Sequence, residues 1–142
     1  MRMTIRLILL IAVLSLSACA IKPITEDGLR STAVVEDSFS VNRAYQEVFK
    51  DLLENTRNCF SRQATQDQLY VSGEKVIADK TATIRVVYLY GNNEKNVHFL
   101  IDLEADDTEK TTVKTYSADS GLESSVKAVK LWANKKNKQC KA

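Results

Sequence analysis

The chain has 142 residues, enough for one domain, with 20 basic and 18 acidic residues and a formal net charge of +2. This near balance removes the electrostatic basis for nucleic-acid binding, which depends on neutralising many phosphates. A single histidine excludes the metal-site patterns that require several histidines. Neither a glycine-rich phosphate loop nor a Gly-x-Ser-x-Gly motif occurs.

The start of the chain has the pattern of a secretory signal. Arg2 and Arg6 precede an apolar run over residues 7–16, and small residues follow it. The run is about ten residues long, whereas a membrane-spanning helix needs roughly 20. Lys22 and Glu26 prevent its extension. An ordinary signal peptide with a chance cysteine and a spanning anchor are the alternative interpretations.

The segment Leu16-Ser17-Ala18-Cys19 resembles a bacterial lipobox. The resemblance implies that the signal is removed and that Cys19 receives a thioether-linked diacylglycerol and an acylated amine. Since two or more acyl chains anchor a protein stably, the bilayer is an expected partner. An aspartate after the cysteine favours inner-membrane retention in Gram-negative lipoproteins. Ala20 stands there and implies the inner leaflet of the outer membrane, with the protein facing the periplasm.

Three segments are expected from this reading of the chain. Residues 1–18 form the lipoprotein signal peptide. Residues 19–30 contain Pro23, the only proline, and turn-forming residues, which predicts a flexible lipidated tether. Residues 31–142 are expected to form one periplasmic domain.

Two cysteines, Cys59 and Cys140, remain once Cys19 carries lipid. An even pair in an oxidising compartment predicts a disulfide. Two free thiols or a redox site are the alternatives. The sequence contains no Cys-x-x-Cys, so a thioredoxin-like site has no support.

Hydrophobic spacing predicts the elements of this domain in chain order. A weak strand signal covers residues 32–39, and spacings of three and four from Val41 to Leu53 then predict an amphipathic helix to about Arg57. Four strands are predicted at 68–76, 81–90, about 96–104 and 111–117, with a hairpin turn at 91–93. In the third of these strands, four apolar residues are predicted to share one face: Val97, Phe99, Ile101 and Leu103.

A last helix is predicted from Ser120 to about Lys138. Ser120 and Glu123 have the spacing of a capping box, which satisfies amides at a helix start. The apolar stripe of this helix comprises Leu122, Val126, Val129 and Ala133, with Trp132 beside it.

The order β-α-β-β-β-β-α predicts an α+β fold with an antiparallel sheet of four to five strands and two helices on one face. A disulfide would bring the two helix ends together, because bridged Cα atoms lie about 5 to 6 Å apart. This order resembles the helix-grip arrangement of START-like domains and of lipoprotein component C of the outer-membrane β-barrel assembly machinery. An unrelated α+β sandwich is the alternative.

No catalytic residue, metal site or cofactor is predicted. His98 is expected on a solvated strand face, and the acidic residues over 102–109 lack the spacing of an EF-hand. The lysines over 135–141 are expected to be a solvated helix end, with contact to anionic headgroups as the alternative. Four aromatic residues are candidates for a ligand or partner surface, with plain core packing as the alternative: Tyr88, Tyr90, Tyr116 and Trp132.

Together these patterns lead to the hypothesis of a non-enzymatic outer-membrane lipoprotein that binds a protein partner in the cell envelope. The first alternative is a protein that binds a small apolar ligand or lipid between the sheet and the C-terminal helix. An envelope hydrolase is the second alternative, and it would need a cavity with converging polar groups.

Overall fold

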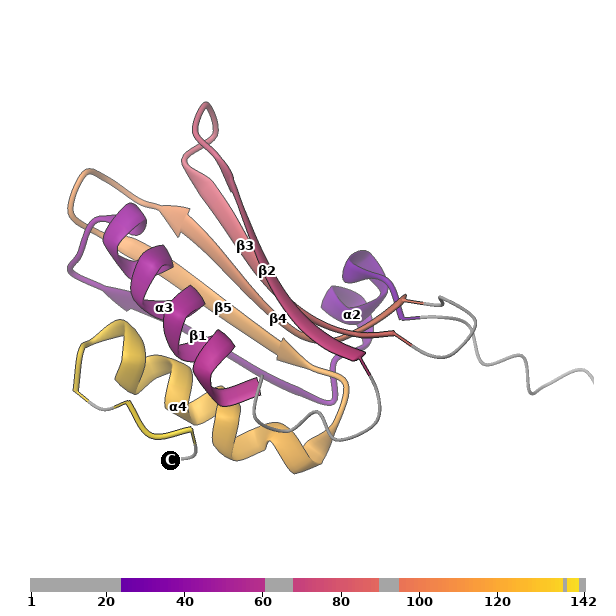
Figure 1. Cartoon of the computed structure of the whole chain (residues 1–142). Coiled ribbons are helices and arrows are strands. Elements are labelled where there is room, and N and C mark those ends of the chain that lie inside the picture. Colours follow the sequence, from indigo (N-terminus) through magenta and orange to yellow (C-terminus); the bar gives the residue numbers. More distant parts are fainter. Residues whose placement is uncertain (1–23, 61–67, 90–94, 137, 141–142) are drawn as a thin grey trace, which may run out of the picture.

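A five-stranded antiparallel sheet forms the centre of the computed structural model, which describes residues 24–60, 68–89, 95–136 and 138–140 (Figure 1). The expected signal peptide, Cys19 and Tyr90 lie outside these residues. Within the described ranges, no helix has the length and apolar character needed to cross a membrane.

The sheet order places the first strand beside the last. The elements are α2 (Glu26–Thr32), β1 (Val35–Val41), α3 (Tyr45–Phe60), β2 (Gln68–Val76), β3 (Thr81–Leu89), β4 (Lys95–Ala105), β5 (Thr111–Ser117), a 3₁₀ turn (Ser120–Leu122) and α4 (Glu123–Ala133). The strands lie in the order β1-β5-β4-β3-β2, and every neighbouring pair is antiparallel. The predicted α+β class and sheet are therefore confirmed.

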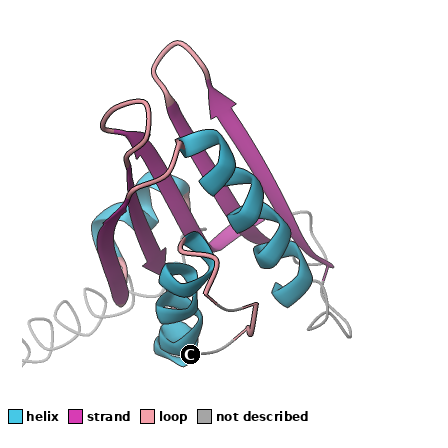
Figure 2. Cartoon of the chain, turned by 90° about the vertical axis from the view of Figure 1, so that its left-hand side faces the viewer, coloured by secondary structure: helices cyan, strands magenta, loops and turns pink. Residues whose placement is uncertain are grey.

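Helices α3 and α4 cover the same face of the sheet, as predicted (Figure 2). Alternate strand residues and the apolar stripes of both helices form one core. Arg43 connects the helices, because its guanidinium donates to the Ala133 carbonyl at 2.8 Å and pairs with Asp51 at 2.7 Å. The largest fully buried side chains of this core are Trp132, Phe99, Leu52, Ile84, Ile101 and Leu103.

The predicted disulfide is present. Cys59 and Cys140 are bonded, and their Cα atoms lie 5.2 Å apart. The expected helix ends were wrong by several residues. Cys59 lies inside the last turn of α3, which ends at Phe60, and Cys140 lies beyond a short segment that follows α4.

Helix α4 ends at Ala133 and does not reach Lys138. Lys135 adopts a positive φ of 56°, its N–H donates to the Trp132 carbonyl, and the Lys136 N–H donates to the Leu131 carbonyl. These two bonds form a Schellman motif, which normally has glycine at the left-handed position. Because a lysine occupies that position, the sequence gave no sign that the helix ends there. The Trp132 indole then donates to the Gln139 carbonyl at 2.7 Å and holds the following segment.

The predicted capping box at Ser120 and Glu123 was also wrong. The Asp119 carboxylate accepts from the Gly121 N–H at 2.8 Å and caps the 3₁₀ turn that precedes α4. Glu123 instead pairs with Lys127 at 2.7 Å. An aspartate one residue earlier therefore begins the helical segment, because the chain enters it through a tighter turn.

Residues 26–30, expected to be part of a flexible tether, belong to α2 on the opposite face of the sheet. Thr25 caps this helix, and Leu29 is 1% exposed. Leu29 forms a second, smaller core with Val87, Val97 and Leu100. One buried leucine in a seven-residue helix is too sparse a pattern to show periodicity, so the helix had no clear sequence signal.

A β-bulge between β3 and β4 changes which face Val97 occupies. Val86 is opposite Phe99 and Val87 is opposite Val97, so His98 has no partner across the pair. Val97 consequently lies in the α2-side core, away from Phe99, Ile101 and Leu103. The prediction that these four residues share one face was wrong at Val97.

Loss of the disulfide should destabilise the protein strongly. The bond spans 81 residues, and closing a loop of that size is worth about 4 to 5 kcal/mol through the entropy of the unfolded chain. We expect the Cys59→Ala/Cys140→Ala variant to lose that much free energy of unfolding in urea titrations. Reduced wild-type protein should behave like the variant, and a loss below about 1 kcal/mol would contradict the prediction.

Acid should destabilise the protein in part through His98. Burial lowers the pKa of this imidazole below its ordinary value of 6.5, and the charge of Asp119 offsets only part of that shift. The unfolded chain therefore takes up the proton at higher pH than the folded protein does. As a result the free energy of unfolding falls as the pH drops below about 6.5.

We expect His98→Gln to lose less stability than the wild type between pH 7.5 and pH 5.5, as measured by urea titration at both values. Carboxylates titrate in both proteins and cancel in the comparison. Equal losses for the two proteins would show that His98 does not contribute.

Candidate functional site

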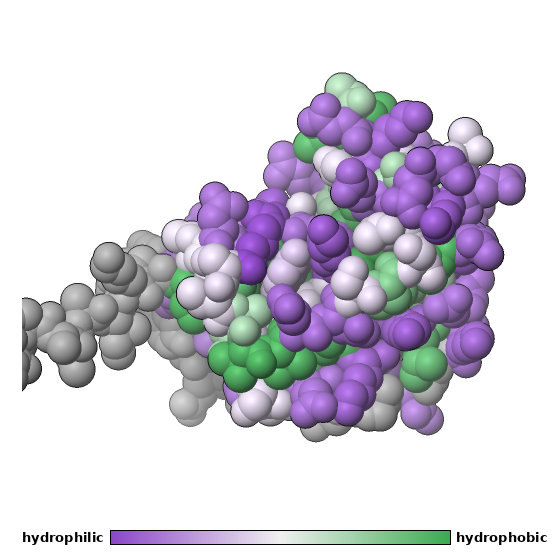
Figure 3. All heavy atoms as spheres, turned by 180° about the vertical axis from the view of Figure 1, so that it is seen from behind, coloured by the Kyte–Doolittle hydropathy of each residue, from purple (hydrophilic) through white to green (hydrophobic). Residues whose placement is uncertain are grey.

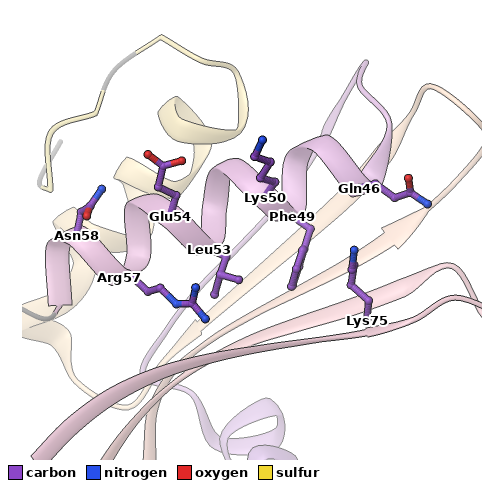
Figure 4. A pocket seen from close by; sticks show the side chains of 8 residues that line it. All are labelled: Gln46, Phe49, Lys50, Leu53, Glu54, Arg57, Asn58 and Lys75. Atoms are coloured by element: carbon purple, nitrogen blue, oxygen red, sulfur yellow. The ribbon is translucent and has the colours of Figure 1, made fainter.

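A groove of about 500 Å³ lies between α3 and the edge strand β2 (Figure 4). Helix α3 supplies most of its wall, and β2 supplies Lys75 from the other side (Figure 4). The lining residues are Gln46, Phe49, Lys50, Leu53, Glu54, Arg57, Asn58 and Lys75.

Phe49 and Leu53 form the apolar floor of this groove, and Gly73 on β2 permits their close approach. A Cβ atom at Gly73 would lie 2.8 Å from Phe49 Cζ and 3.0 Å from Leu53 Cδ1. Any side chain there would push the helix or its side chains away from the strand. Glycine is therefore needed at this position for its small size, and it sets the width of the groove.

Positive charge surrounds this floor. Lys50 and Arg57 are exposed on α3, and the Lys75 ammonium lies 5.5 Å from the centroid of the Phe49 ring. Glu54 is the one acidic residue among the lining side chains. Of the four arginines in the described ranges, Arg57 alone has no carboxylate partner there. The groove thus combines apolar surface with cations that the described chain does not neutralise.

The outer edge of β2 runs beside the groove. This strand has nine residues, and it is the last in the sheet order, so its outer side has no strand neighbour among the described residues. The hairpin that continues it carries two exposed apolar residues, Val76 at 42% and Ile77 at 72%. An open edge of this length can accept another extended segment.

Charges on the opposite face of the sheet are, by contrast, largely paired. Arg30 donates to both Asp102 oxygens at 2.7 and 3.0 Å, and Thr83 donates to the same carboxylate. Arg85 forms an ion pair with Glu26, with Nε 2.7 Å from Oε1, and its Nη2 donates to Glu26 Oε2 at 3.4 Å. Seen from behind the view of Figure 1, the surface is largely hydrophilic, with an apolar band across its lower part (Figure 3).

Tyr116 belongs to this second face. It borders a hollow of about 410 Å³ together with Glu36, Asp37, Ser38 and Lys114. Burial, and then the negative charge of Asp102, raise the pKa of its phenol above the ordinary value of 10. The Tyr116 phenol therefore stays neutral, which suits a structural or hydrogen-bonding role better than a role as a nucleophile.

Of the four aromatic candidates for a ligand or partner surface, Tyr90 lies outside the described residues, and Trp132 and Tyr116 lie on opposite faces of the sheet. Trp132 is 1% exposed in the core under α3 and α4, whereas Tyr116 lies on the α2 side. Tyr88 packs edge-on against His98, with ring centroids 4.4 Å apart. Buried side chains from α4 and the sheet occupy the space where an apolar ligand was the alternative hypothesis.

No catalytic arrangement emerges from the described side chains. The Ser-x-x-Lys spacing of some acyl-transfer enzymes occurs at Ser72–Lys75, but residues three apart on a strand point to opposite faces. It recurs at Ser124–Lys127, where Lys127 pairs with Glu123. Across residues 24–60, 68–89, 95–136 and 138–140, no three His, Cys, Asp or Glu side chains converge as a metal site.

Comparisons with protein-family models, curated proteins and solved structures find no match to this chain. The resemblance of its element order to the helix-grip arrangement therefore stays a prediction. The groove was not predicted from sequence either. Its only signal was the pair of cations, Lys50 and Arg57, on the exposed side of an amphipathic helix, and such residues normally indicate nothing more than a solvated face.

Filling the space at Gly73 should destabilise the protein. We expect Gly73→Val to lower the free energy of unfolding by about 2 kcal/mol, because overpacking forces Phe49 and Leu53 to move. Urea titration would measure this loss. Ser72→Ala is the matched control, since Ser72 Oγ is buried without a hydrogen-bond partner in the described chain and its removal should be nearly neutral. A Gly73→Val protein as stable as the wild type would contradict the close contact.

Proposed function

We propose that this protein is a non-enzymatic lipoprotein of the outer membrane, anchored through acylated Cys19, whose domain binds a protein partner at the periplasmic face. The observation that carries the proposal is the lipobox-like segment Leu16-Ser17-Ala18-Cys19 directly after a short apolar run. Ala20, in place of an aspartate, supports the outer membrane as the destination.

The start of the described chain supports a close attachment to the bilayer. The Val97 N–H donates to the Ile24 carbonyl at 2.9 Å, and the Ile24 N–H donates to Asn96 Oδ1 at 2.7 Å. Ile24 is thereby held at the beginning of β4. Five residue steps separate it from Cys19, and they can span at most about 18 Å. An acylated Cys19 would keep this end of the sheet within that distance of the membrane.

The groove between α3 and β2 supports a binding role for the domain. Among the described residues it joins apolar surface, cations without carboxylate partners and a strand edge without a neighbour, a combination suited to a protein segment. The alternative role as a carrier of an apolar ligand has less support, because Trp132, Val126 and Val129 already fill the space between the sheet and α4.

Cys19→Ser should abolish lipid attachment. In cells fed radiolabelled palmitate, we expect the wild-type chain to carry label and to fractionate with the outer membrane. The Cys19→Ser chain should carry none, because serine provides no thiol for the thioether. Ala20→Asp should keep its label and shift to the inner membrane.

The Cys59→Ala/Cys140→Ala variant is the matched control, since it loses two cysteines and should still be labelled. Failure of the wild-type chain to take up palmitate, in cells where a resident lipoprotein is labelled, would overturn the proposed anchor.

A further inference from the structure

We infer that the open edge of β2 and the adjoining groove bind an extended, acidic segment of an envelope protein as an added β-strand. The inference deepens the proposed function and rests on it for the setting in which the partner is met. It assigns the partner a chemistry and a geometry, each of which follows from a separate feature of the groove.

The backbone of β2 supplies the geometry. A strand at the end of a sheet presents a row of N–H and C=O groups that an incoming extended segment can pair with. Strand β2 has nine residues, Gln68–Val76, and all of them pair with β3 in one continuous register without a bulge. An added strand of that length would extend for about 30 Å.

The groove supplies a site for alternate side chains of that strand. Residues of an added strand that face α3 would meet Phe49 and Leu53, and the next ones along would face away. Phe49 is 7% exposed, and Leu53 is partly buried against the core. The floor is thus firm apolar surface that favours apolar side chains at alternate positions.

The positive charge of the groove favours a negatively charged partner. Lys50, Arg57 and Lys75 surround the floor against the single acid Glu54, and in the described part of the chain none of the three cations forms an ion pair. Carboxylates at α3-facing positions of the added strand, on either side of the apolar residues that meet the floor, would give these cations their partners. A basic or neutral segment would leave them unpaired.

The other edge of the sheet lacks this combination. Strand β1 carries Glu36 and Asp37, so its edge repels an acidic segment. Helix α4 packs on β1, and Lys130 lies 5.7 Å from the centroid of the Phe39 ring. The two edges therefore differ in charge, and the β2 edge is the one suited to an acidic strand.

Fluorescence anisotropy with the full chain, extracted from whole cells in detergent, tests the inference. The probe is a fluorescein-labelled peptide of nine residues in which the odd positions alternate between glutamate and valine or phenylalanine and every even position is threonine. Acidic and apolar side chains of this peptide can therefore face α3 together. We expect saturable binding of this probe. The same peptide with lysine replacing glutamate should bind at least tenfold more weakly, because it would add cations to the groove.

Backbone pairing has its own test. The probe is methylated at every second amide nitrogen, in each of the two alternating registers. We expect one register to bind at least tenfold more weakly, because its methyl groups replace the N–H groups that face β2. If both methylated peptides bind as well as the parent, strand addition is wrong.

Two charge-reversed proteins locate the contact. Lys50→Glu/Arg57→Glu, which alters exposed side chains only, should weaken binding at least tenfold. Lys130→Glu/Lys136→Glu, on the α4 side, makes the same change in net charge and should alter it less than twofold. Circular dichroism and thermal melting would establish that both variants are folded.

Three outcomes would overturn the inference. They are no binding of the acidic peptide at millimolar concentration, equal weakening by both charge-reversed proteins, or displacement of the peptide by vesicles of anionic phospholipid. The last would identify the groove as a site for lipid headgroups. None of these measurements depends on acylation of Cys19, so their failure is distinguishable from failure of the anchor.

Discussion

The pairing of β1 with β5 is the constraint from which the rest of the architecture follows. It places the first strand at one edge of the sheet and β2 at the other, so α3 must carry the chain across the face between them. That crossing covers β2, β3 and β4, and it leaves β1 and β5 for α4. The shared core, the disulfide between the ends of the two helical segments, and the open edge of β2 all result from this path.

The two faces of the sheet are stabilised by different physics. On the α3 and α4 side, alternate apolar residues are buried in one cluster, and burial of that surface is the main source of stability. On the α2 side, one short helix contributes Leu29 to a small apolar cluster, and Arg30 forms a bidentate pair with Asp102. Carboxylates pair Arg30 and Arg85 on this side. The cations around the α3 groove, which have no carboxylate partner among the described residues, are therefore a feature that packing does not require.

Position in the membrane and shape of the groove are independent features of the proposed function. The Ile24 contacts to Val97 and Asn96 shorten the link to Cys19 from the dozen residues first expected to five steps. The domain would then stay against the bilayer and meet partners that come to it. A groove that binds an extended segment suits a domain held close to the bilayer, because the segment can extend from its own protein to reach the groove.

Local sequence determined the elements and the pairing of the cysteines. Alternating residues predicted the strands over 81–90 and 111–117, and the three- and four-residue spacing from Val41 to Leu53 predicted a helix. The even number of cysteines left beside Cys19 predicted the disulfide. These signals were sufficient because they arise from neighbouring residues or from simple counting.

Tertiary contacts decided the rest. The Leu29 helix, the bulge at His98 and the stop at Lys135 each depend on a contact or backbone geometry that no local pattern encodes. The groove depends on the same kind of information. Packing of α3 against β2 brings four residues into one surface: Phe49, Arg57, Gly73 and Lys75. Each of them has an ordinary role in its own helix or strand, and only the packing gives them a shared one.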